Sequence, residues 1–200
     1  MIGIFIEPNG KLKKYINNWK KKINKNFIKT KLTSHPPHST IYYANLTNNK
    51  NIINNLKRIL KKIDSFKIII NKTDIFYDDK LAGGDTLYLS IKKNTKLFHI
   101  QKKIADELKF HIKTSSYKNK NINLKNKVLM KSQKKYGYPF VGDHWMPHFT
   151  ISSIKNKRNS PEFKQFIDEK IRFINKINSI SVWKISGNRH VLIKKLKLRN

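Results

Sequence analysis

The sequence has no cysteine among its 200 residues. This absence excludes a disulfide framework, a thiolate nucleophile and a Cys-ligated zinc or iron–sulfur site. There is also no uninterrupted apolar stretch of about 18 residues, the length that crosses a membrane, and no basic segment precedes the short apolar run at the N-terminus. We therefore expect a soluble, cytoplasmic protein that makes no membrane contact.

Acidic residues are scarce, because 12 Asp+Glu stand against 44 Lys+Arg and give a formal net charge of +32. A basic surface of this size is typical of proteins that bind nucleic acid, since neutralised phosphates release counterions. A second explanation is genome composition, because the abundant Lys, Asn and Ile share A/T-rich codons and only five of the cations are Arg. The sequence leaves both explanations open.

Hydrophobic residues make up 38% of the chain and aromatic residues 11%, enough for a real core. The pattern predicts a mixed α+β chain with no separate linker, which forms one domain over residues 1–200. A Lys/Asn-rich stretch at 114–126 predicts a loop. Alternating or helical spacing predicts strands at 2–7, 39–43, 66–70, 75–77, 86–91, 149–154, 180–185 and 191–198, and helices at 11–28, 52–63, 97–108 and 160–174.

One short element occurs twice. Residues 37–41 read Pro-His-Ser-Thr-Ile, residues 147–151 read Pro-His-Phe-Thr-Ile, and each copy opens a predicted strand. A proline is tolerated at a strand's first residue, and side chains beyond it alternate between the two faces. We therefore expect His38 and Thr40 to share one face of their strand, and His148 and Thr150 to share one face of theirs.

Two imidazoles that face each other can divide a proton transfer, one as general base and the other as general acid, without a metal or other cofactor. Two threonine hydroxyls can donate hydrogen bonds to the non-bridging oxygens of a phosphate held between the histidines. The pattern thus points to the making or breaking of a phosphodiester. The alternative is that both histidines are structural residues at strand starts.

With these residues the sequence resembles the 2H phosphoesterases, and within them the LigT-like or 2′,5′ RNA ligase-like group, defined by two H-x-T/S motifs. The strand at 87–91 and the helix from 96 to 108 also resemble the family's middle strand and helix. The resemblance implies a bilobed α+β fold of two pseudo-symmetric lobes, each with an antiparallel sheet and flanking helices, around a central cleft. It assigns the catalytic positions to His38, Thr40, His148 and Thr150.

The resemblance further implies hydrolysis of 2′,3′-cyclic phosphates, or cleavage or joining of 2′,5′ linkages, in RNA or nucleotides. We expect a monomer whose partner is such a phosphodiester substrate. Two other readings stay open: an RNA-binding module without turnover, and a degenerate paralogue with a structural role. The sequence does not say which histidine is the acid and which the base.

Further residues are candidates for substrate contacts. Tyr42 and Ser152 lie two positions beyond the motif threonines, so alternation predicts that both line the cleft. The aromatic run 136–140, which includes Tyr138, either stacks on a base or covers the core. The sequence at residues 82–85 indicates a hairpin turn in preference to a phosphate-binding loop. The spacings of His35 to His38 and of His144 to His148 suggest no metal site, because prolines inside both intervals prevent a helix.

Overall fold

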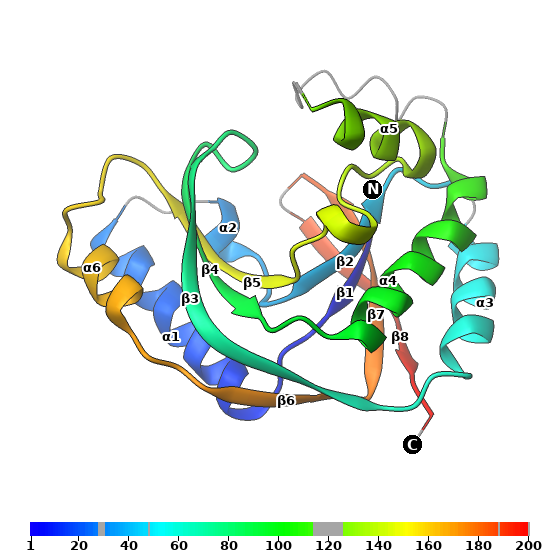
Figure 1. Cartoon of the computed structure of the whole chain (residues 1–200), viewed down its shortest axis with the longest axis horizontal. Coiled ribbons are helices and arrows are strands. Elements are labelled where there is room, and N and C mark those ends of the chain that lie inside the picture. The colour runs from blue at the N-terminus through cyan, green and yellow to red at the C-terminus, as the bar shows by residue number, and fades with distance from the viewer. Residues whose placement is uncertain (28–30, 48, 114–125, 188, 200) are drawn as a thin grey trace.

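The computed structural model describes residues 1–27, 31–47, 49–113, 126–187 and 189–199. Two four-stranded antiparallel sheets form its centre, with strand orders β2-β1-β7-β8 and β5-β4-β3-β6 (Figure 1). The first sheet contains β1 (Ile2–Ile6), β2 (Ser39–Ala44), β7 (Ser179–Ser186) and β8 (Arg189–Lys197). The second contains β3 (Phe66–Asp79), β4 (Gly84–Ile91), β5 (His148–Ile154) and β6 (Phe173–Ile177).

Each sheet contains one strand–helix–strand unit, and this repetition explains the pseudo-symmetry of the two lobes. In the first unit α1 (Gly10–Asn26) connects β1 to β2, and in the second α4 (Thr95–Leu108) lies between β4 and β5. Each helix packs on the sheet of the other lobe, because α1 contacts β5 and β6 whereas α4 contacts β2. These crossed helices tie the lobes together. The other helices are α2 (Lys31–Ser34), α3 (Asn49–Leu60), α5 (Lys127–Tyr136) and α6 (Pro161–Asp168).

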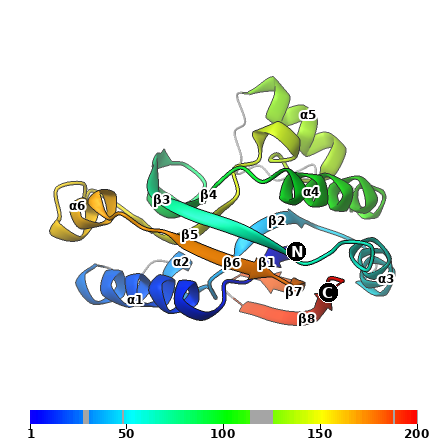
Figure 2. The same cartoon turned by 60° about the horizontal axis from the view of Figure 1, so that its bottom comes forward.

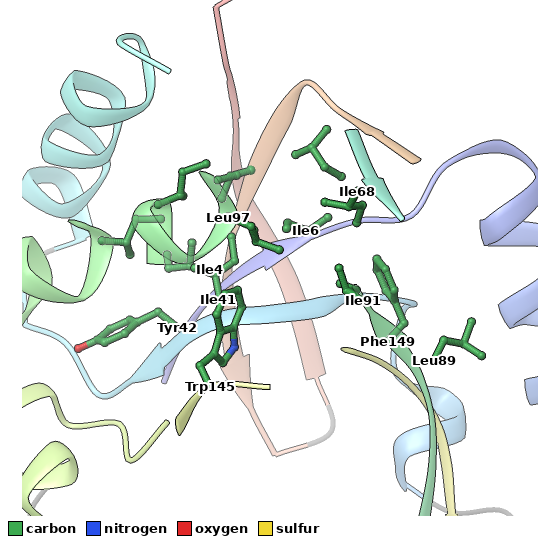
Figure 3. Close-up of a cluster of buried hydrophobic side chains, with 14 of the residues drawn as sticks. Ile4, Ile6, Ile41, Tyr42, Ile68, Leu89, Ile91, Leu97, Trp145 and Phe149 are labelled. Atoms are coloured by element: carbon green, nitrogen blue, oxygen red, sulfur yellow. The ribbon is translucent and has the colours of Figure 1, made fainter. Parts of the chain in front are cut away.

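The helices gather at two ends of the molecule. Figures 1 and 2 show α1 and α6 at one end, and α3 and α4 at the other. One buried cluster nevertheless connects the two sheets: Ile4 and Ile41 come from the first, Ile91 and Phe149 from the second, and all are at most 4% exposed (Figure 3). Within the described part of the chain, no helix combines the length and the apolar character needed to cross a membrane.

The structure confirms the α+β class and most predicted elements, and it corrects three details. The strands predicted at 66–70 and 75–77 are one strand, because a shift in the register between Ile70 and Lys72 lets β3 continue through its polar middle. The helix predicted over 160–174 ends at Asp168, and 173–177 instead pairs with β3 as β6. The helix α5 is an addition to the predicted elements. Residues 114–125 of the predicted loop lie outside the described residues.

Local signals explain several boundaries. Ser160 caps α6 by accepting a hydrogen bond from the Phe163 amide, and Pro161 occupies the first turn, as predicted. Asn126 caps α5 in the same way, and Gly137 ends it with a left-handed φ of 63°. The turn between β3 and β4 is at residues 80–83, where Gly83 has a φ of 78°, whereas the second half of the turn predicted over 82–85 belongs to β4.

One carboxylate joins the start of the chain to its last third. Glu169, just after α6, accepts hydrogen bonds through Oε2 from the Tyr15 hydroxyl at 2.5 Å and from Trp19 Nε1 at 2.9 Å. Burial, followed by the bonded carboxylate, raises the pKa of Tyr15. The helix α1, which carries both donors, is thereby fixed against the second lobe.

We predict that Glu169→Ala lowers the free energy of unfolding by about 1–3 kcal/mol, because two half-buried donors lose their acceptor. Glu169→Gln keeps an acceptor oxygen and should lose clearly less. Urea unfolding followed by circular dichroism measures both. Equal destabilisation by the two variants would contradict an acceptor role for Glu169.

Candidate active site

The two H-x-T motifs lie at the start of β2, which His38 immediately precedes, and on β5. Both strands are edge strands of their sheets and contact each other across the lobes. His38 and Thr40 are partly exposed, and so are His148 and Thr150. The intervening and following residues are buried: Ser39 is 1% exposed, and Ile41, Phe149 and Ile151 are at 0%. The predicted alternation is therefore confirmed through both motifs.

Each motif histidine makes the same hydrogen bond. His38 Nδ1 lies 2.6 Å from the carbonyl oxygen of Pro36, and His148 Nδ1 lies 2.6 Å from that of Met146. A carbonyl oxygen can only accept, so Nδ1 carries the proton and donates it in both rings. In the neutral imidazole Nε2 is then the basic nitrogen. Both side chains are thus held with the same nitrogen available for proton transfer.

Aromatic rings pack against both imidazoles. The Phe5 ring lies 4.1 Å from the His38 ring, centroid to centroid, and Tyr88 and Phe76 lie 5.1 and 5.2 Å from His148. Phe5 itself rests over Gly3, where an added Cβ would come within 2.2 Å of the Phe5 ring. Gly3 therefore provides the space that lets Phe5 pack beside His38.

The expectation that Tyr42 and Ser152 line the cleft is wrong, because both are buried at 0% exposure. Each motif strand has a register shift just beyond its threonine, so that Thr40 and Tyr42 face consecutive residues of β1, and Thr150 and Ser152 face consecutive residues of β4. Such a bulge breaks the alternation of side chains. The Tyr42 hydroxyl instead donates to the Tyr136 carbonyl, and its ring lies in the core (Figure 3).

Three of the four motif residues, Thr40, His148 and Thr150, line one pocket of about 430 Å³. Tyr138 and Phe140 line it as well, whereas Tyr136 is buried at 6% exposure. The aromatic run 136–140 thus divides between the pocket and the core. The remaining wall is largely apolar and includes Leu32, Phe76, Leu81, Trp145 and Met146, together with Asp79, Ala82, Thr86 and His144.

Hydrogen bonds fix the parts of the chain that carry this pocket. Trp145 Nε1 donates to the Thr40 carbonyl at 2.9 Å, which links the loop before β5 to β2. Arg158 binds Asp85 through two hydrogen bonds of 2.7 and 2.8 Å and Asp78 through a third of 2.7 Å. This bidentate pair holds the β3–β4 hairpin, which supplies Asp79 to the pocket wall.

His38 lines a second, smaller pocket of about 130 Å³ and belongs to a cationic neighbourhood. The rings of His35 and His190 lie 4.2 Å apart, and the His190 ring lies 6.2 Å from His38. Lys20, which is 6% exposed, donates to the carbonyls of Leu32 and His35 at 2.7 and 3.0 Å. It therefore anchors the segment that leads into the first motif.

The two imidazoles differ in their charged surroundings. The pKa of His38 is lowered to about 3, chiefly by burial; Lys20, His190 and His35 act in the same direction, and the Pro36 carbonyl opposes them. Burial also lowers the pKa of His148, but here the Met146 carbonyl and the Asp79 carboxylate act to raise it. Electrostatics thus favours a proton on His148 over one on His38.

Among the described residues, no group of three or more His, Asp and Glu side chains is arranged to hold a metal ion. The chain's residues 8–189 match the family model of the 2′-5′ RNA ligase superfamily. The chain belongs to this superfamily. A comparison with curated protein sequences finds no match.

Solved structures share the fold of this superfamily member at low sequence identity. TT0787 of Thermus thermophilus is 9% identical with a TM-score of 0.62, and 99% of this chain aligns with 97% of that one. A crystal structure titled phosphoesterase is 8% identical with a TM-score of 0.55, covering 100% and 98%. LigT of E. coli in complex with 3′-AMP is 8% identical with a TM-score of 0.54, also covering 100% and 98%. The predicted bilobed fold is confirmed.

Sequence reasoning misses several residues of this superfamily member's site. The pattern around His190 predicts a surface or ordinary packing residue, yet its ring lies near that of His38. Asp79 and Lys20 are not among the predicted site residues. Lys20 has a detectable signal, because it follows Ile16 by four positions on the buried stripe of α1. Gly3 and Asp79 have no such signal in the sequence, since the role of Gly3 depends on the position of the Phe5 ring and that of Asp79 on the β3–β4 hairpin.

We predict that the His38 imidazole of the substrate-free protein stays neutral from pH 5 to pH 8 with Nδ1 protonated, because burial lowers its pKa. The unfolded chain takes up this proton near pH 6.5. The His38 contribution to stability is therefore complete above that pH and is lost as the pH falls toward about 3. Nitrogen-15 NMR of the imidazole measures the tautomer and the titration, and a midpoint near 6.5 would contradict the assignment.

Proposed function

We propose that this protein is a metal-independent phosphodiesterase that hydrolyses 2′,3′-cyclic phosphates or 2′,5′ linkages in RNA or nucleotides. The observation that carries the proposal is the pair of imidazoles that are each held through Nδ1 and each accompanied by a threonine on the same strand face. The LigT structure with bound 3′-AMP supports it, because a 3′-nucleotide is a product type of cyclic-phosphate hydrolysis.

In this proposal His38 is the general base and His148 the general acid. Burial lowers the pKa of His38, and Lys20, His190 and His35 act in the same direction, so its Nε2 is unprotonated and accepts the proton of the attacking water. Burial also lowers the pKa of His148, but the carboxylate of Asp79 in the same pocket opposes this effect, so we assign to His148 the donation of a proton to the leaving oxygen. Joining of a 2′,5′ linkage would exchange the two roles.

The threonines act on the phosphate itself. Thr40 and Thr150 both line the larger pocket, and their hydroxyls are proposed to donate to the non-bridging oxygens as negative charge increases there. Tyr138 and Phe140, whose ring centroids lie 5.7 Å apart, are placed to stack on the base of a bound nucleoside. The single domain over 1–200, the monomeric state and the cytoplasmic location stay predictions.

We predict that His38→Ala and His148→Ala each lower kcat for a 2′,3′-cyclic nucleotide by at least about 10²-fold, the usual contribution of a general acid or base. A chelator should leave wild-type turnover unchanged. The exposed His99 on α4 offers a matched control, and His99→Ala should retain full activity. Tight RNA binding with no turnover in the wild type would favour the RNA-binding module instead.

Asp79 offers a test of the assigned roles. Its oxygens accept hydrogen bonds from the Leu81 amide at 2.9 Å and from the Thr86 hydroxyl at 2.8 Å. Asp79→Asn keeps one acceptor oxygen for the Leu81 amide, and the Thr86 hydroxyl can turn to accept from the new NH2 group. Without the carboxylate the pKa of His148 should fall, so the high-pH limb of the kcat profile moves to lower pH. A shift of the low-pH limb alone would reverse the roles of the two histidines. A pH–rate series on a cyclic nucleotide measures this.

A further inference from the structure

The smaller pocket beside His38 lies at one end of the first sheet. Glu7 follows β1, Trp183 comes from β7, His190 from β8 and Lys13 from α1. Its volume is about 130 Å³, against about 430 Å³ for the pocket beside His148. The two motif histidines thus border two pockets of different size and polarity.

Two polar atoms of this small pocket's residues are buried without a hydrogen-bond partner in the described structure. One is Oε1 of Glu7, an acceptor, and the other is Nε1 of Trp183, a donor. The second carboxylate oxygen of Glu7 is occupied, because Oε2 accepts from Lys195 Nζ at 3.3 Å. Buried polar groups in folded proteins are nearly always paired, since an unpaired group costs its desolvation energy. Two such atoms in one pocket point to a ligand.

The chemistry of the two atoms identifies the kind of ligand. One free acceptor and one free donor match a neutral group that offers both a donor and an acceptor. The edges of nucleobases offer both, and proteins recognise single-stranded RNA through them. A second phosphodiester fits poorly, because it offers only acceptors and would leave Oε1 of Glu7 unpaired.

We propose that the pocket of Glu7 and Trp183 binds the base of a second nucleoside, the one on the His38 side of the cleaved phosphate. This inference rests on the proposed phosphodiesterase function and deepens it. The larger aromatic pocket binds the nucleoside on the His148 side. The smaller pocket contacts the edge of the other nucleoside's base, on the His38 side. A 2′,5′-linked dinucleotide fills both pockets, whereas a cyclic mononucleotide fills the larger one alone.

The variants Glu7→Met and Trp183→Phe test the proposal. The first has a side chain of similar length and removes the acceptor, the second keeps an aromatic ring and removes the donor, so each removes one hydrogen bond. Each should therefore raise KM for a 2′,5′-linked dinucleotide by roughly five- to tenfold. KM for a 2′,3′-cyclic mononucleotide should not change. Equal effects on both substrates, or no effect on either, would show that water alone satisfies these atoms and would overturn the proposal.

Thermal unfolding separates binding from a structural role. Trp183→Phe removes an unpaired buried group, so Tm of the free protein should stay the same or rise. Lys195→Met is the matched control, because it breaks the ion pair of Glu7 and leaves Oε1 in place, and dinucleotide KM should change little. A large fall in Tm with Trp183→Phe would mark it as structural and overturn the proposal.

Failure of the proposed phosphodiesterase function can be distinguished from failure of the pocket proposal. If the wild type hydrolyses neither substrate, the phosphodiesterase function is rejected, and the intact dinucleotide can then be used in calorimetric titration. Weaker dinucleotide binding by Glu7→Met and Trp183→Phe than by wild type would still support the pocket. Equal affinities, or no binding to the wild type, would reject it.

Discussion

The hydrogen bond from each imidazole Nδ1 to the carbonyl two residues earlier is the constraint on which the site depends. The proline between them, Pro37 or Pro147, explains why this bond forms twice. A residue before proline is restricted to extended backbone, and proline fixes its own φ near −65°, so the carbonyl of Pro36 or Met146 is held in place. The same proline can open a strand without breaking the sheet. The repeated Pro-His pair therefore orients an imidazole and also begins a strand.

Around these matching bonds the two lobes differ. His38 lies beside Phe5 and near His190, with Lys20 among the charges that lower its pKa, whereas His148 lies against Tyr88 and Phe76 in the pocket of Asp79. A symmetric pair of histidines would have no preferred direction for proton transfer. In the proposed mechanism the differing charges set which imidazole accepts the proton, and the differing pockets set which way the substrate lies. The surroundings of the two motifs, and not the motifs themselves, therefore distinguish the two histidines.

The sequence predicted the parts of the site that depend on short patterns. Alternation placed the motif residues on one face, and Ser160-Pro161 marked the start of α6 correctly. It failed where tertiary pairing overrides the local pattern. Residues 173 and 174 leave their predicted helix because β3 offers an edge with which 173–177 pair, and the bulges after Thr40 and Thr150 turn Tyr42 and Ser152 into the core. The periodicity of a segment shows neither the strand with which it will pair nor a bulge that changes the direction of its side chains.

The scarcity of acidic residues makes the position of each one informative. With 12 carboxylates against 44 Lys and Arg, most cations in this chain have no anionic side chain to pair with. The carboxylates named here are nevertheless placed at specific contacts: Glu169 holds α1, Asp85 holds the β3–β4 hairpin through Arg158, Asp79 lines the pocket of His148 and Glu7 lines that of His38. The Glu7 carboxylate is paired with Lys195, so it does not leave the smaller pocket with an uncompensated negative charge. The net charge of +32 can attract RNA from a distance, and in the proposed function selection at the cleft depends on contacts to bases and on the two threonines.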